Sequence, residues 1–118
     1  MIATRRKAML EELRDEVCEM NLALVEEGLV TQTWGNASAI DRAQNLIAIK
    51  PSGVPYETLS ADSIVIVDLE GRIVEGDLSP SVDLPAHLVI YKAFRGVGAV
   101  VHTHSHYATC FCQARRPI

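Results

Sequence analysis

The chain has 118 residues, 48% hydrophobic and 22% charged, a balance that predicts a single globular domain over residues 1–118 and excludes a disordered chain. Its formal net charge of −4 comes without a basic stripe, which excludes the usual surface for binding nucleic acid. No apolar run reaches the length of a membrane span, and an acidic segment stands where a secretory signal has its apolar stretch. We therefore expect a cytoplasmic protein that does not bind membranes.

The first part of the chain predicts a helix followed by a strand hairpin. Apolar side chains recur at helical spacing over residues 10–25, and Gly28 is typical of a residue that ends a helix. Residues 29–41 are rich in β-branched and small side chains and predict one or two short strands. A turn then leads into a returning strand at residues 46–50.

The remainder predicts three more strands and two more helices. The strands are expected at residues 64–67, 72–75 and 99–104, and the helices at residues 84–94 and 106–115. Pro85 fits the first turn of its helix, where a missing N–H costs nothing. Hairpin-linked strands with helices before and after predict an α/β fold, a three-layer α/β/α sandwich around a largely antiparallel sheet.

Three of the four histidines, His102, His104 and His106, lie within five residues. If the last strand extends to residue 104, His102 and His104 point to the same face, with their Cα atoms about 6.5–7 Å apart. Two imidazoles at that spacing can converge on one ion at the usual Zn–N distance of about 2.0–2.1 Å. We therefore predict that both bind a divalent metal, with an oxygen atom as third ligand.

Asp83 is the best candidate for that oxygen ligand. It stands at the junction between a loop and the helix predicted from residue 84. A carboxylate in this position has an ordinary alternative role, because it can accept hydrogen bonds from the amides of the first helical turn. The sequence leaves the two interpretations open.

Two loops next to predicted strands, residues 34–38 and 50–53, combine small and hydrogen-bonding side chains. Ser52 and the following glycine offer a hydroxyl and backbone amides to a phosphate, and Lys50 adds a positive charge. Ser81 adds a hydroxyl near the start of a helix, where the helix dipole favours an anion. Each segment alone is typical of a turn, but their occurrence beside the histidine cluster indicates an anion site.

Four motifs, in this order and spacing, resemble the class II aldolase/adducin family and, within it, the L-ribulose-5-phosphate 4-epimerases. The resemblance extends from Met9 onward. The motifs are Thr33-Trp34-Gly35-Asn36, Ile49-Lys50-Pro51-Ser52-Gly53, Pro80-Ser81-Val82-Asp83-Leu84-Pro85-Ala86-His87 and Val101-His102-Thr103-His104. The resemblance implies that Asp83, His102 and His104 are metal ligands. It implies substrate contacts from Gly35, Asn36, Lys50, Ser52, Gly53 and Ser81.

The resemblance also implies a reaction, the epimerisation of L-ribulose 5-phosphate to D-xylulose 5-phosphate by cleavage and re-formation of a C–C bond. Zn²⁺ or another divalent first-row metal serves as the Lewis acid. Asp83 favours the epimerases, because the aldolases of the family usually carry glutamate there. Two alternatives stay open: an aldolase acting on a related phosphorylated sugar, and an inactive remnant that serves as a binding module.

The sequence departs from the family pattern at two places. Val82 replaces the second serine of the usual Pro-Ser-Ser, which removes a hydroxyl from the phosphate pocket. The third metal-binding histidine and the acid/base Asp and Tyr of the family lie beyond the position of Ile118. We therefore expect the N-terminal part of the domain, without catalytic residues and inactive alone. Because the family builds its sites between subunits of a homotetramer, we also expect a homo-oligomer.

Overall fold

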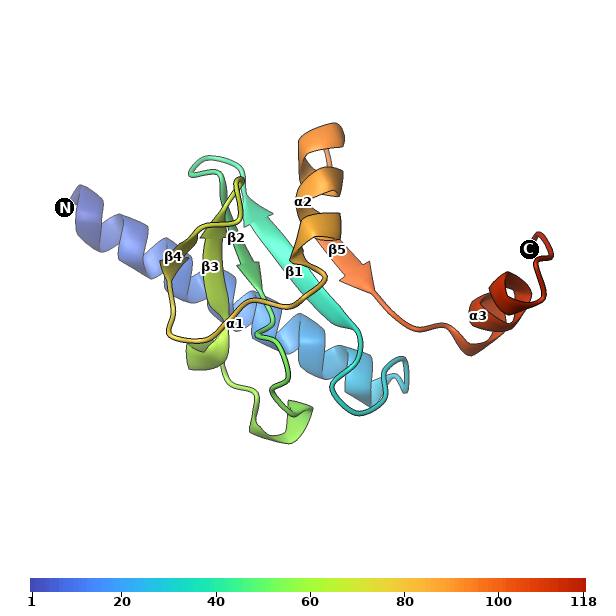
Figure 1. Ribbon diagram of the computed structural model, residues 1–118. Coiled ribbons are helices and arrows are strands. Elements are labelled where there is room, and N and C mark those ends of the chain that lie inside the picture. Colours follow the sequence, from blue (N-terminus) through green and yellow to red (C-terminus); the bar gives the residue numbers. More distant parts are fainter.

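The computed structural model describes residues 1–118 as an α/β fold built on one five-stranded sheet (Figure 1). The strands lie in the order β4-β3-β2-β1-β5, and every neighbouring pair is antiparallel. They are β1 (Asn36–Asp41), β2 (Leu46–Ile49), β3 (Val65–Asp68), β4 (Ile73–Glu75) and β5 (Ala99–His102). The helices are α1 (Ile2–Glu26), α2 (Leu84–Ala93) and α3 (His106–Gln113). The predicted α/β fold around an antiparallel sheet is confirmed.

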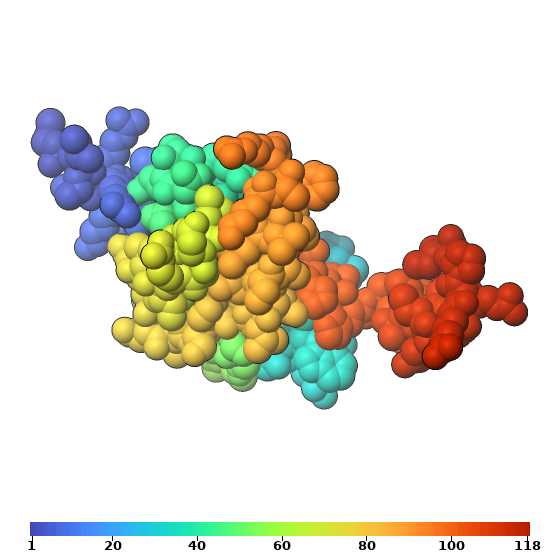
Figure 2. All heavy atoms as spheres, turned by 45° about the horizontal axis from the view of Figure 1, so that its top comes forward, coloured from blue at the N-terminus to red at the C-terminus, as the bar shows by residue number.

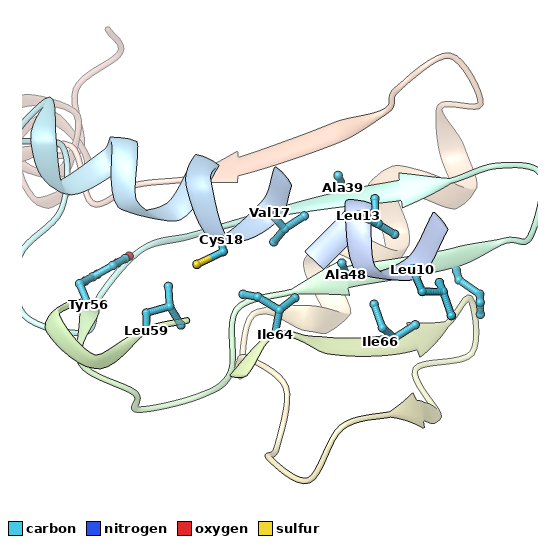
Figure 3. Close-up of a cluster of buried hydrophobic side chains, with 11 residues drawn as sticks. Leu10, Leu13, Val17, Cys18, Ala39, Ala48, Tyr56, Leu59, Ile64 and Ile66 are labelled. Atoms are coloured by element: carbon cyan, nitrogen blue, oxygen red, sulfur yellow. The ribbon is translucent and has the colours of Figure 1, made fainter. Parts of the chain in front are cut away.

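Helix α1 covers one face of the sheet. Its buried side chains recur at helical spacing and pack on alternate residues of the central strands (Figure 3). The two short 3₁₀ helices between β2 and β3, Tyr56–Thr58 and Ala61–Ser63, close the end of this cluster. The buried members are Leu10, Leu13, Val17, Cys18, Ala39, Leu46, Ala48, Tyr56, Leu59, Ile64 and Ile66.

Helix α2 covers the opposite face. Leu84 and Tyr91 pack there on the other set of alternating residues, which are Ile40, Ile47, Ile49, Val65 and Val67. Because both faces of β2 and β3 are covered, these strands are apolar at nearly every position and do not alternate with polar residues. The core fixes the register of the sheet, since a slip by one residue exchanges the two faces.

Two predicted strand boundaries are wrong. Residues 29–35 form turns instead of a strand, because Gln32 and Gly35 adopt positive φ angles of 56° and 73°. Strand β5 ends at His102 and does not reach His104, because its partner β1 begins at Asn36, which pairs with His102. The backbone turns away at Gly35 and leaves the residues after His102 without a partner strand.

The C-terminal segment lies apart from the sheet. Helix α3 has no buried residue, and Figures 1 and 2 show it projecting beyond β5. Strand β5 forms an edge of the sheet. No helix combines the length and apolar composition of a membrane-spanning segment.

Candidate metal and phosphate site

A pocket of about 260 Å³ opens where β1 begins, β2 ends and the loop before α2 passes. It contains every residue for which the sequence predicted a substrate contact. The lining residues are Thr33, Trp34, Gly35, Asn36, Lys50, Pro51, Ser52, Gly53, Ser81, Val82, Asp83 and His104. The fold thus brings together three loop segments and His104, all separated by long stretches of sequence.

Backbone hydrogen bonds tie two of these segments together. The Ser81 amide donates to the Lys50 carbonyl at 3.0 Å, and the Ser52 amide donates to the Ser79 carbonyl at 2.9 Å. The Ser52 amide is therefore already occupied, and only its hydroxyl and the residues beside it remain for an anion. The expectation that both backbone amides of this loop are free is wrong for Ser52.

Gly35 holds the third segment close to β5. It adopts φ +73°, and a Cβ atom there would lie 2.6 Å from Val30 Cγ1 and 2.9 Å from the His102 carbonyl oxygen. Only glycine fits this combination of conformation and contact. The neighbouring Asn36 is consequently placed next to the loop that carries Ser81 and Asp83.

Asn36 organises the floor of the pocket and is only 2% exposed. Its Nδ2 group donates to Ser81 Oγ at 3.0 Å and to Asp83 Oδ2 at 2.7 Å. Its Oδ1 atom is buried without a hydrogen-bond partner. Ser81 Oγ also accepts from the Asp83 amide at 3.2 Å, so its own proton is free for donation. Ser81 therefore presents a hydrogen-bond donor for a ligand in the pocket.

Lys50 is a buried cation in the wall of this pocket, 2% exposed. Its Nζ atom donates to the carbonyls of Val54 at 3.0 Å and Pro51 at 3.4 Å, and lies 4.8 Å from the centroid of the Tyr56 ring. No carboxylate pairs with it. Burial lowers the pKa of Lys50, because the charged form loses contact with water. An anion bound in the pocket would compensate the buried charge.

Asp83 faces the pocket instead of capping its helix. It occupies the N-cap position of α2 but makes no side-chain cap hydrogen bond, so the capping interpretation is wrong. Its Oδ2 atom accepts from Asn36 and, at 3.0 Å, from His102 Nδ1. Burial raises the pKa of Asp83, but the hydrogen bond from Asn36 and the charge and hydrogen bond of His102 outweigh burial and lower it. The side chain is a carboxylate at neutral pH.

The histidines are close to one another but do not share a strand face. The His104 ring lies 4.9 Å from the His102 ring between centroids and stacks on Trp34 at 5.6 Å. No three histidine, cysteine or carboxylate side chains converge closely enough to hold an ion in this conformation. Two imidazoles and a carboxylate are nevertheless donors that suit Zn²⁺, and the bond from His102 Nδ1 to Asp83 leaves the Nε2 atom of His102 free. The metal-ligand assignment stays a prediction.

A buried polar network beside the site was not predicted. His87, 1% exposed, shares a hydrogen bond of 2.6 Å between its Nδ1 atom and Ser38 Oγ, which in turn contacts the Tyr91 hydroxyl at 2.7 Å. Burial lowers the pKa of His87, the nearby Asp83 raises it and His102 lowers it, with a net decrease. The i, i+4 spacing of Asp83, His87 and Tyr91 along α2 is the signal that indicates one shared helix face.

Comparison with known proteins identifies one matching family model and several similar solved structures. Residues 15–118 match the model of the class II aldolase and adducin N-terminal domain. An L-fuculose 1-phosphate aldolase is 34% identical with a TM-score of 0.83, over 89% of this chain and 50% of that protein. The L-fuculose-1-phosphate aldolase from Thermus thermophilus is 30% identical with a TM-score of 0.66, over 84% of this chain and 49% of that protein.

A third solved structure is that of YgbL from Klebsiella pneumoniae, whose reaction is given only as aldolase, epimerase or decarboxylase. It is 29% identical with a TM-score of 0.76, over 86% of this chain and 48% of that protein. The chain thus spans about half the length of the solved relatives it matches. These similarities support the aldolase alternative better than the predicted ribulose-phosphate epimerase.

Proposed function

Because this chain belongs to the class II aldolase/adducin family, we propose that it supplies the phosphate pocket and part of the metal site of a sugar-phosphate aldolase. The observation that carries the proposal is the buried, unpaired Lys50 in a pocket that also contains Asp83 and His104. A cation without a carboxylate partner is costly in a protein interior unless a bound anion compensates it.

The phosphate group of the substrate binds between Lys50 and the two loops in this proposal. Lys50 supplies the charge, and the hydroxyls of Ser52 and Ser81 and the backbone at Gly53 supply donors. Asn36 holds Ser81 and Asp83 in position through its two Nδ2 hydrogen bonds. Gly35 places Asn36 and makes room for the ligand.

Asp83, His102 and His104 are the residues that would hold a divalent cation, Zn²⁺ or another first-row metal. Such an ion supplies Lewis-acid polarisation of the ketose carbonyl and the adjacent hydroxyl. Asn36 keeps Asp83 ionised and oriented through its 2.7 Å hydrogen bond, and Asp83 in turn holds the His102 ring at 3.0 Å. Trp34 covers one face of His104. We assign no acid/base catalyst to this chain.

The epimerisation of L-ribulose 5-phosphate is the second candidate. The presence of Asp83 favours it, because the aldolases of the family usually carry the longer glutamate at this position. Both reactions break a C–C bond next to a carbonyl, so the same pocket and cation serve either one. The fate of the aldehyde fragment, released or added back through its other face, separates them.

The test assays the longest reading frame that contains this chain, in the presence of Zn²⁺. An aldolase releases a triose phosphate from L-fuculose 1-phosphate, whereas an epimerase forms xylulose 5-phosphate from L-ribulose 5-phosphate without net release of fragments. Binding by the 118-residue chain itself is measured with L-fuculose 1-phosphate and with L-fuculose. Equal affinity for the two ligands would contradict a phosphate pocket at Lys50.

A further inference from the structure

One buried tyrosine lies behind the pocket and touches two of its walls. Tyr56, 5% exposed, does not line the pocket. Its hydroxyl lies 3.0 Å from the carbonyl oxygens of both Trp34 and Gly35 and donates its one proton to this pair. The centroid of its ring lies 4.8 Å from Lys50 Nζ. The same Nζ atom donates a hydrogen bond to the carbonyl of Val54, two residues before Tyr56.

We propose that Tyr56 is a positioning residue for the anion pocket: its hydroxyl fixes the loop at Trp34 and Gly35, and its ring fixes the Lys50 ammonium. The inference rests on the proposed function, because Tyr56 is inferred to set the distance between the groups that bind the phosphate. Tyr56 touches neither the ligand nor the metal ligands itself.

The two contacts act on two different segments of the pocket lining. The hydroxyl holds the loop that leads into Asn36. The aromatic face attracts the ammonium of Lys50, which follows the end of β2. Tyr56 is anchored in turn by the core under α1, where it packs in one cluster with Leu59 and Cys18 (Figure 3). The spacing of the pocket is thereby set by the rigid core and not by the loops alone.

The protonation state of Tyr56 is consistent with this role. Burial raises the pKa of Tyr56 to about 12, so the hydroxyl remains a donor over the whole physiological range. A donor shared by the two carbonyls holds two consecutive peptide planes in one relative orientation. Loss of the hydroxyl leaves the buried Gly35 carbonyl and the partly buried Trp34 carbonyl without this donor.

The experiment separates the two contacts with two variants of the 118-residue chain. Tyr56→Phe removes the hydroxyl and keeps the ring, and Tyr56→Leu removes both. Tyr107→Phe is the control, because Tyr107 is 78% exposed on α3, away from the pocket. Inorganic phosphate is the probe, titrated calorimetrically at a temperature at which circular dichroism shows every variant folded. Trp34, the single tryptophan, reports the order of the loop by fluorescence anisotropy.

We expect the Kd for phosphate to rise about 3- to 10-fold in Tyr56→Phe, the effect of one lost hydrogen bond to a loop that shapes the pocket. The anisotropy of Trp34 should fall in the same variant. The Kd of Tyr56→Leu should rise at least about 3-fold further, because the cation–π contact with Lys50 is also removed. Tyr107→Phe should match the wild type in both measurements.

A phosphate affinity in Tyr56→Phe equal to that of the wild type overturns the inference, even if this variant unfolds at a lower temperature. In that case Tyr56 contributes only to stability. A wild-type chain that binds no phosphate refutes the proposed pocket first, and the role of Tyr56 with it. The two failures are therefore distinguishable in one titration series.

Discussion

Lys50 shows how a site for an anion can be recognised in a chain without a ligand. Its side chain is almost fully buried, yet only two carbonyls and an aromatic ring face its ammonium. A residue selected for stability alone would be apolar here or paired with a carboxylate. The unfavourable burial of Lys50 is therefore expected to reflect binding.

Replacement of Lys50 by methionine should stabilise the chain and abolish phosphate binding. We expect a gain of about 1–2 kcal/mol in the free energy of unfolding at pH 7, because an apolar side chain of similar length replaces a buried cation. Urea denaturation and calorimetric titration with phosphate measure the two effects. Lys92→Met, at an exposed position on α2, is the control and should change neither.

The stability difference should also depend on pH in a defined direction. Burial lowers the pKa of Lys50 below its ordinary value of 10.5, so the folded chain releases this proton more readily than the unfolded chain. The contribution of neutral Lys50 is present above pH 10.5 and is lost as the pH falls through the lowered pKa. The advantage of Lys50→Met should thus shrink as the pH is raised toward that range.

Val82 is the residue at which the pocket differs from the family pattern. It lines the pocket and is 80% exposed, so its replacement by serine removes no core contact. Val82→Ser should add one hydrogen bond to a charged phosphate, worth roughly 1.5–3 kcal/mol at most, and lower the Kd for a phosphorylated sugar. Val89→Ser, at an exposed valine on α2, is the matched control. Unchanged affinity in Val82→Ser would show that residue 82 does not face the phosphate.

The metal assignment is testable with the histidines themselves. His102→Ala or His104→Ala should remove bound zinc, because each variant leaves too few protein donors for a stable site. His106→Ala should keep it, since His106 lies in α3 with its ring against Tyr107. Elemental analysis after dialysis, carried out on the longest reading frame that contains this chain, gives the zinc stoichiometry. Equal zinc content in all three variants would refute the assignment of His102 and His104.

At the level of elements, helix α2 carries the site on its N-terminal end, and the side chain of Arg42 binds the backbone at its other end. The guanidinium of Arg42 donates to the carbonyls of Tyr91 at 3.0 Å, Phe94 at 3.0 Å and Val97 at 2.8 Å. It also lies 5.6 Å from the centroid of the Tyr91 ring. The Tyr91 carbonyl lies in the last turn of α2 and the Phe94 carbonyl at its C-cap, where a helix leaves its carbonyls free, whereas Val97 lies in the loop that follows.

Arg42→Ala should therefore destabilise the chain by about 2–4 kcal/mol, the sum expected for several charge-assisted hydrogen bonds in a partly buried place. The change should appear as a lower urea midpoint. Arg95→Ala is the control, because Arg95 is exposed nearby and makes no hydrogen bond or ion pair. If Arg42→Ala unfolds at the same midpoint as Arg95→Ala, α2 does not depend on this contact.

At the level of the whole molecule, β5 presents an unpaired edge with apolar neighbours. Val101 is 54% exposed on this strand, and Ile90 of α2 lines a cavity together with Val101. An edge strand with exposed apolar side chains is a template for pairing with another chain. The pocket and the histidines lie at the end of this same edge.

The 118-residue chain should accordingly self-associate, bind zinc weakly and show no turnover of a sugar phosphate. It carries the pocket but spans only about half the length of its solved relatives, and no acid/base group has been assigned in it. Size-exclusion chromatography tests the self-association, with Val101→Lys as a variant expected to reduce it. A coupled triose-phosphate assay tests the absence of turnover. A monodisperse and active wild-type chain would contradict them.

The amino-acid sequence alone determined the elements and their approximate ends. Periodicity and turn residues are local properties, so they predicted all three helices and all five strands. Two starts were wrong: α1 begins at Ile2, before the periodic region at residues 10–25, and β1 begins at Asn36 instead of near residue 29. The motif resemblance likewise predicted that distant segments such as those of Asn36, Lys50 and Ser81 belong to one site. Antiparallel pairing then brought these segments together, as expected.

Only the tertiary structure decided what each side chain does there. The end of β5 at His102 depends on where β1 begins, and the role of Asp83 depends on Asn36 across the pocket. The hydrogen bonds of Tyr56 and His87 join residues more than twenty positions apart in sequence, so no local pattern contains them. The whole sheet sets the pairing register and the burial of each residue. Register and burial then determine which of its chemically possible roles a side chain has.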